Sequence, residues 1–134
     1  MDTSRRAILI CGLPASGKTT LALGIVSSNP DAILIDDPTD WMDVNERIAS
    51  HKGLVILTDP HLCFISSREV AQQRFEELGF RIEWLFFENN PKQCIVNAKG
   101  RAKEVNLDIS WFSKSYSIPL GVVSIPVYSG ITSC

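Results

Sequence analysis

The chain has 134 residues, of which 45% are hydrophobic, and its formal net charge at pH 7 is −2. This length and composition predict one globular domain, residues 1–134, with a sizeable core. The near-balanced charge excludes a strongly basic nucleic-acid binder, so contact with a polynucleotide would use a local patch. Since no apolar run reaches the length of a membrane span and no signal-peptide pattern opens the chain, we expect a cytoplasmic protein without membrane contact.

The four cysteines are scattered and form no C-x-x-C pair. Three of them lie in or beside apolar segments, which favours buried, reduced thiols. A zinc site is disfavoured, because the chain has only two histidines to add to them.

A phosphate-binding pattern follows the first predicted strand, residues 7–11. Residues 12–19 read Gly-Leu-Pro-Ala-Ser-Gly-Lys-Thr, which is the P-loop sequence G-x-x-x-x-G-K-[ST]. Residues 18–28 behind it have the pattern of a helix. A loop at a helix N-terminus directs backbone N–H groups at one point, where the helix dipole also favours negative charge. The pattern therefore predicts a nucleoside triphosphate site, with a Gly-rich turn that only packs as the alternative.

The chemistry of the P-loop assigns roles to its residues. We expect Lys18 to reach the β- and γ-phosphates and the Thr19 hydroxyl to bind Mg²⁺, while the glycines let the backbone wrap the β-phosphate. The predicted nucleotide contacts are Gly12, Pro14, Ala15, Ser16, Gly17, Lys18, Thr19 and Thr20.

Apolar strands alternate with amphipathic helices along the rest of the chain. The predicted strands are residues 7–11, 32–35, 54–58, 82–87 and about 122–127. The predicted helices are residues 18–28, 40–50, 66–78, 91–98 and about 108–116. This alternation predicts an α/β, three-layer P-loop NTPase fold, with a mostly parallel sheet of about five strands and helices on both faces.

Local signals mark several of the helix ends. Ser66 and Glu69 match a capping box, and Gly79 would end that helix. Asn90 and Pro91 match an N-cap and a first helical position.

Polar groups follow four of the predicted strands, at the sheet edge where ligands bind in such folds. They are the P-loop, the pair Asp36-Asp37, Asp59 and residues 88–90. Transfer of a phosphoryl group to a hydroxyl needs bound phosphates, a metal ion and a carboxylate that accepts a proton. Asp36 or Asp37 is the predicted general base, since we expect the second strand to lie beside the first. The alternative is that Asp-Asp-Pro is only a turn.

Three further residues are predicted around the acceptor. Asp59 ends an apolar strand as a Walker B carboxylate does, and would hold Mg²⁺ or orient the acceptor, unless it only caps a turn. His61 would touch substrate, with a polar turn residue as the alternative. Trp41 would stack on a base, with a place in the core as the alternative.

A basic segment at about residues 97–106 lies between two predicted helices. It contains Lys99, Arg101 and Lys103 and predicts a lid that closes cations over the triphosphate, with Arg101 in the catalytic role. A solvated surface is the alternative.

The chain resembles the kinase domain of bacteriophage 5′-hydroxyl polynucleotide kinase and its relatives over nearly its whole length. The resemblance rests on the P-loop, the acidic turn, residues 57–62 with Arg68, and the segment 120–130. It implies Mg²⁺-assisted transfer of the γ-phosphate of ATP to a nucleic-acid hydroxyl. It also gives Lys18 and Thr19 the phosphate and metal roles, makes an Asp after the second strand the base, and makes Arg101 the lid arginine.

The chain departs from that family on the acceptor side. Ala15 replaces a usual P-loop glycine, Thr39 and Asp40 stand where the family has an arginine, and Val96 and Asn97 replace a second lid arginine. The acceptor-binding insertion between residues 37 and 54 is short. An open cleft suits a large substrate, so we expect a 5′-hydroxyl end or a hydroxymethylated pyrimidine in DNA as acceptor. A small-metabolite kinase and a nucleotide-gated regulatory ATPase are the alternatives, and the sequence leaves the oligomeric state open.

Overall fold

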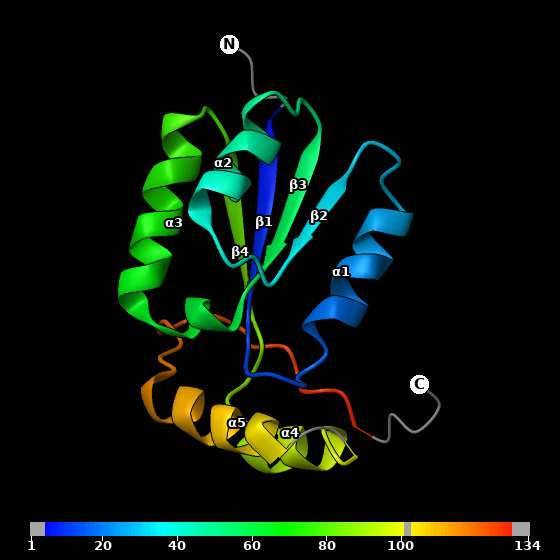
Figure 1. The fold of residues 1–134 in the computed structure, drawn as a ribbon, viewed down its shortest axis with the longest axis vertical. Coiled ribbons are helices and arrows are strands. Elements are labelled where there is room, and N and C mark those ends of the chain that lie inside the picture. Colours follow the sequence, from blue (N-terminus) through cyan, green and yellow to red (C-terminus); the bar gives the residue numbers. More distant parts are fainter. Residues whose placement is uncertain (1–4, 101–102, 130–134) are drawn as a thin grey trace.

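The computed structural model describes residues 5–100 and 103–129 (Figure 1). Within them, four parallel strands form one sheet in the order β2-β3-β1-β4. The strands are β1 (Arg6–Cys11), β2 (Ile33–Asp36), β3 (Leu54–Thr58) and β4 (Arg81–Phe86). The two central strands, β1 and β3, are almost fully buried, which explains why their sequences are nearly continuous apolar runs.

Helices cover both faces of the sheet, as the alternating pattern predicts. In Figure 1, α1 (Lys18–Ser27) lies on one side of the sheet, whereas α2 (Trp41–Ala49) and α3 (Ile65–Glu77) lie on the other. A short 3₁₀ helix, η1 (Pro60–Cys63), connects β3 to α3. The helices α4 (Pro91–Asn97) and α5 (Lys103–Ser115) gather beyond the carboxyl ends of the strands. The three-layer α/β prediction is therefore confirmed.

Most of the predicted helix ends agree with the structure. The Asn90 side chain accepts a hydrogen bond from the backbone N–H of Gln93 at 3.2 Å, with Pro91 as the first helical residue. Gly79 has a φ of 86°, the left-handed conformation that ends helices. The capping box is wrong, because α3 begins at Ile65 and places Ser66 inside the helix. The ring of Phe64, packed 5.4 Å from Phe112, lies just before the helix instead.

The sheet differs from the prediction in three respects. The second strand does not lie beside the first, because β3 lies between β2 and β1. The fifth strand is reduced to one parallel bridge between Phe87 and Ile125, because Pro126 has no N–H and the Val127 N–H donates to the Glu88 side chain. The last helix begins at Lys103 rather than at about residue 108.

Candidate nucleotide and acceptor site

The P-loop turns sharply between β1 and α1. Ala15 has a φ of 67° and Gly17 a φ of 109°, and the Ser16 N–H donates to the Leu13 carbonyl at 3.2 Å. No side chain caps the N-terminus of α1. Because the first N–H groups of a helix have no partner within the helix, this end of α1 can receive an anion.

The two P-loop glycines are required by close approach. A Cβ on Gly12 would lie 2.7 Å from Ser16 Oγ, and a Cβ on Gly17 would lie 2.8 Å from the ring of Tyr128. Ser16 Oγ is buried and has no hydrogen-bond partner in the structure. The loop is thus closely packed from within and from the C-terminal segment.

Lys18 is held under the loop rather than extended into solvent. Only 8% of its surface is exposed, and its Nζ donates to the Leu13 carbonyl at 2.8 Å. Burial lowers the pKa of this ammonium, while Cys63, Cys94 and Asp36 act in the opposite direction. A cation buried at this point would gain from an anion placed within the loop.

Asp36 ties three elements together beside the P-loop. Its carboxylate accepts hydrogen bonds from the hydroxyl of Thr19 on α1, at 3.1 Å, and from the hydroxyl of Thr58 on β3. The Thr19 hydroxyl and the Asp36 carboxylate both offer oxygen atoms, which are the ligands that Mg²⁺ prefers. No group of three or more His, Cys, Asp and Glu side chains among the described residues could hold a metal ion by itself. Phosphate oxygens and water would have to complete the coordination, as they commonly do for Mg²⁺.

Asp37, the next residue, faces a different space. Its φ is 50°, and its N–H donates to the Thr58 carbonyl at 2.7 Å. Its side chain lines a cleft of about 750 Å³ between α2, η1 and α3. Partial burial raises the pKa of this carboxyl, and the neighbouring carboxylates of Asp59 and Asp36 raise it further.

Asp59 and His61 form a pair on the same cleft. Asp59 is only 9% exposed, and its carboxylate accepts from the His61 backbone N–H at 2.9 Å as the N-cap of η1. The same oxygen lies 3.0 Å from His61 Nδ1. The His61 ring packs edge-on against Phe112 at 5.4 Å. Asp59 therefore caps a turn and also lines the cleft, and its contact with an acceptor or Mg²⁺ stays a prediction. The Thr19 hydroxyl bonds Asp36 rather than Asp59.

The rest of the cleft is apolar and hydroxyl-bearing. Trp41, at the start of α2, forms one wall; its ring lies edge-on to Phe75 at 6.4 Å, and the Arg74 guanidinium lies 5.6 Å from its centroid. Trp41 is thus both a packing residue and a cleft residue. Ser66 and Ser67 on α3 add hydroxyl groups. Among the described residues that line the cleft, none is Lys or Arg.

Asn97 and Tyr128 hold the P-loop, and Glu88 holds the segment that packs on it; the sequence assigns no individual role to any of them. Asn97, at the end of α4, donates to the carbonyls of Ala15 at 3.0 Å and Tyr128 at 2.7 Å. The Tyr128 N–H donates to the Ser16 carbonyl at 3.2 Å, and Glu88 accepts from Val127 N–H at 3.0 Å. The only sequence signal was the placement of residues 88–90 after a strand and the resemblance of the C-terminal segment.

Other predicted residues have different outcomes. Arg101 lies outside the described residues, so the lid arginine stays a prediction. Lys99 follows α4 and is exposed. Thr19 and Thr20, in the first turn of α1, are exposed as well. Arg68 has a structural role: it is buried and donates to the carbonyls of Leu62 and Ser117 at 2.9 and 2.7 Å.

The described cysteines are free and buried. Burial raises the pKa of the Cys11 and Cys63 thiols to about 12 and that of Cys94 to about 11. These thiols stay protonated at neutral pH and act as small apolar side chains.

The chain is similar to a viral protein in sequence. It is 30% identical over 121 residues to an uncharacterized protein of Acanthamoeba polyphaga mimivirus, and the match spans 85% of this chain and 88% of that protein. No family model matches the chain.

Two solved structures share its fold. A gluconokinase from Sinorhizobium meliloti 1021 superposes with a TM-score of 0.65 at 14% identity, over 93% of this chain and 83% of that chain. The protein APE1195 superposes with a TM-score of 0.65 at 17% identity, over 95% and 87%. The predicted P-loop NTPase fold is therefore confirmed. No helix among the described residues is long and apolar enough to cross a membrane.

Proposed function

The chain belongs to the same family as the mimivirus protein, and we propose that it is a Mg²⁺- and ATP-dependent kinase that phosphorylates a hydroxyl acceptor. The observation that carries this proposal is the arrangement around Thr58. Asp36, which accepts from the Thr58 hydroxyl, also bonds the P-loop residue Thr19. Asp37 lines a cleft that is large enough for an acceptor.

The P-loop would bind the triphosphate. The free N–H groups at the start of α1 and the buried ammonium of Lys18 would neutralise the β- and γ-phosphates. Thr19 and Asp36 would hold Mg²⁺, which when bound supplies positive charge to the phosphate oxygens. Arg101 would add a cation from the lid.

Asp37 would act as the general base. It faces the cleft, whereas Asp36 is engaged by two hydroxyl donors. A carboxylate with a raised pKa accepts a proton more readily, which favours deprotonation of the acceptor hydroxyl as it attacks. The pair Asp59–His61, which lines the same cleft, would orient that hydroxyl.

The first acceptor we propose is a hydroxyl on nucleic acid, either a 5′-hydroxyl end or a hydroxymethylated pyrimidine in DNA. The Trp41 wall supports this choice, since an aromatic ring offers a stacking surface to a base. The resemblance of the sequence to the 5′-hydroxyl polynucleotide kinase family supports the same choice.

The second candidate is a kinase for a small, uncharged alcohol. The described cleft residues favour it, because they offer carboxylates, hydroxyls and apolar walls but no Lys or Arg for an anionic group. These side chains suit a polyol as well as they suit a nucleoside.

An acceptor panel tests the proposal. Enzyme, Mg²⁺ and γ-labelled ATP are incubated with 5′-hydroxyl oligonucleotides, DNA carrying hydroxymethylated pyrimidines, free nucleosides and neutral polyols. Label on a polymer supports the first candidate, and label only on a polyol or nucleoside supports the second. Release of label as free phosphate only, with every acceptor, would replace the kinase with a regulatory ATPase.

A further inference from the structure

Among the described residues, the outer edge of β4 has no partner strand before Phe86. Within the described residues, β4 pairs with β1 on one side, and on the other side only the bridge at Phe87 and Ile125 follows. The N–H groups of Arg81 and Phe87 point to β1, where they donate to Arg5 and Cys11. By alternation along the strand, the backbone groups of Ile82 and Trp84 point away from the sheet.

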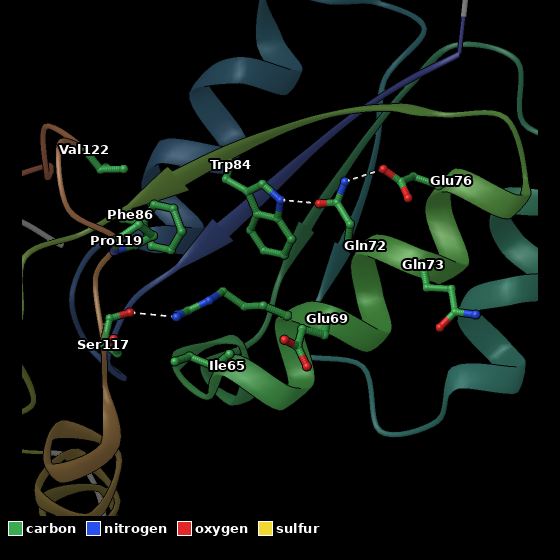
Figure 2. Close-up of a pocket in the computed structure, with 11 residues that line it drawn as sticks. Ile65, Glu69, Gln72, Gln73, Glu76, Trp84, Phe86, Ser117, Pro119 and Val122 are labelled. Carbon is green, nitrogen blue, oxygen red and sulfur yellow. Dashed lines mark hydrogen bonds between the residues drawn. The ribbon is translucent and has the colours of Figure 1, made fainter.

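A groove of about 700 Å³ lies beside this edge, on the α3 face (Figure 2). Its floor is apolar, whereas Glu69, Gln72, Gln73 and Glu76 form its α3 wall. Trp84 and Phe86 form its floor, and Ile65 and Val122 lie at its rim. Trp84 Nε1 donates to the Gln72 side chain at 2.7 Å, so the indole is held in place across the groove. An open edge next to apolar side chains favours addition of another strand.

The charges on β4 identify the added strand. Arg81 and Glu83 are both exposed and lie on the same face of β4, opposite to the groove. In an antiparallel pair centred on Ile82, Arg81 of each copy would lie directly opposite Glu83 of the other. A shift of the register by two residues, which sets Ile82 opposite Trp84, would instead place the two Glu83 side chains against each other. The sequence of this strand is therefore complementary to itself in one register.

We propose that two copies of the chain associate through their β4 edges, with Ile82 on the two-fold axis. The two sheets would form one continuous eight-stranded sheet. The Ile82 pair would exchange two backbone hydrogen bonds, and the two Arg81–Glu83 pairs would flank it. The two grooves would meet across the axis, so that Ile82 and Trp84 of each copy cover the apolar floor of the other. The P-loops remain free, because they lie at the carboxyl ends of the strands.

Charge reversal tests both the interface and its register. Arg81→Glu and Glu83→Arg should each convert two attractive pairs into two repulsive ones and weaken the dimer about tenfold or more. The double variant Arg81→Glu/Glu83→Arg should restore it. An equimolar mixture of the two single variants should form a heterodimer, since each mixed pair again joins Glu to Arg.

The measurement is sedimentation equilibrium of the full chain over a wide concentration range. Lys92→Glu and Glu46→Lys are matched controls, because both residues are exposed on helices away from β4. Circular dichroism of each variant checks that it is folded. A wild-type chain that stays monomeric at millimolar concentration would overturn the proposal. A dimer that tolerates both single reversals, or that neither the double variant nor the mixture restores, would also overturn it.

Discussion

The substitution Asp37→Asn removes the proposed general base and leaves Asp36, the proposed Mg²⁺ ligand, in place. The amide keeps the shape of the carboxylate, and Asn tolerates the left-handed φ of 50° at this position. Loss of a general base lowers turnover by about 10²- to 10⁴-fold. This corresponds to roughly 3–5 kcal/mol of activation free energy. Binding of ATP should remain, since Asp37 has no contact with the P-loop threonine.

The same substitution should slightly stabilise the fold. The pKa of Asp37 is raised in the folded protein above its ordinary value of 3.8, so its ionised form is disfavoured by folding. Above the raised pKa this destabilisation is fully present, and it disappears as the pH falls below the ordinary value. Asp37→Asn should therefore raise the free energy of unfolding at neutral pH. We expect less than about 1 kcal/mol, because the carboxylate is only partly buried and solvent screens its charge.

Two assays on one set of variants test the assignment of Asp37 as the general base. Transfer of label from γ-labelled ATP and urea unfolding are measured for wild type, Asp37→Asn and Asp36→Asn. Asp43→Asn, an exposed position on α2, is the control. Asp36→Asn should raise the Mg²⁺ requirement and lose stability, since Asp36 holds two hydroxyl donors. Wild-type turnover by Asp37→Asn would refute the assignment of the base, and Asp59 would then be tested next.

Three further predictions concern the packing of the P-loop. Gly17→Ala should weaken ATP binding at least tenfold by isothermal titration, because its Cβ would lie 2.8 Å from the Tyr128 ring; unchanged affinity would contradict the packing. Ala15→Gly should raise the free energy of unfolding by up to about 1 kcal/mol in urea, since left-handed strain is relieved and partly offset by chain entropy; a clear loss of stability would refute the strain. Asn97→Ala should cost about 1–2 kcal/mol and raise the KM for ATP, since two carbonyls lose their donor; a stable variant with normal KM would show that the loop is held elsewhere.

The P-loop could be predicted from the sequence because its spacing is local and each position has a chemical reason. The strand order could not, because nothing in β2 or β3 alone records which of them lies beside β1. The different surroundings of Asp36 and Asp37 depend on Thr58, which lies on another strand. The local sequence pattern therefore places Asp36 and Asp37 at the sheet edge, but it does not show which of them faces the P-loop and which faces the cleft.

Residues that act through distant contacts were missed for a related reason. Asn97 bonds Ala15, a residue 82 positions earlier in the chain, and no periodic pattern marks such a contact. The predicted fifth strand had the apolar composition of a strand, but Val123 is 91% exposed and Pro126 interrupts the hydrogen bonding. The helix α3 begins at Ile65, one residue before the Ser66 signal, and no side chain caps its N-terminus.

The most direct test of the central claim is transfer of label from γ-labelled ATP to the acceptor panel by wild type and Lys18→Ala, side by side with Mg²⁺. The proposed kinase predicts labelled acceptor with wild type and a loss of several orders of magnitude with Lys18→Ala, because its buried ammonium is the P-loop cation. Equal transfer by both proteins would contradict the P-loop assignment. Hydrolysis by wild type without a labelled acceptor would contradict the kinase.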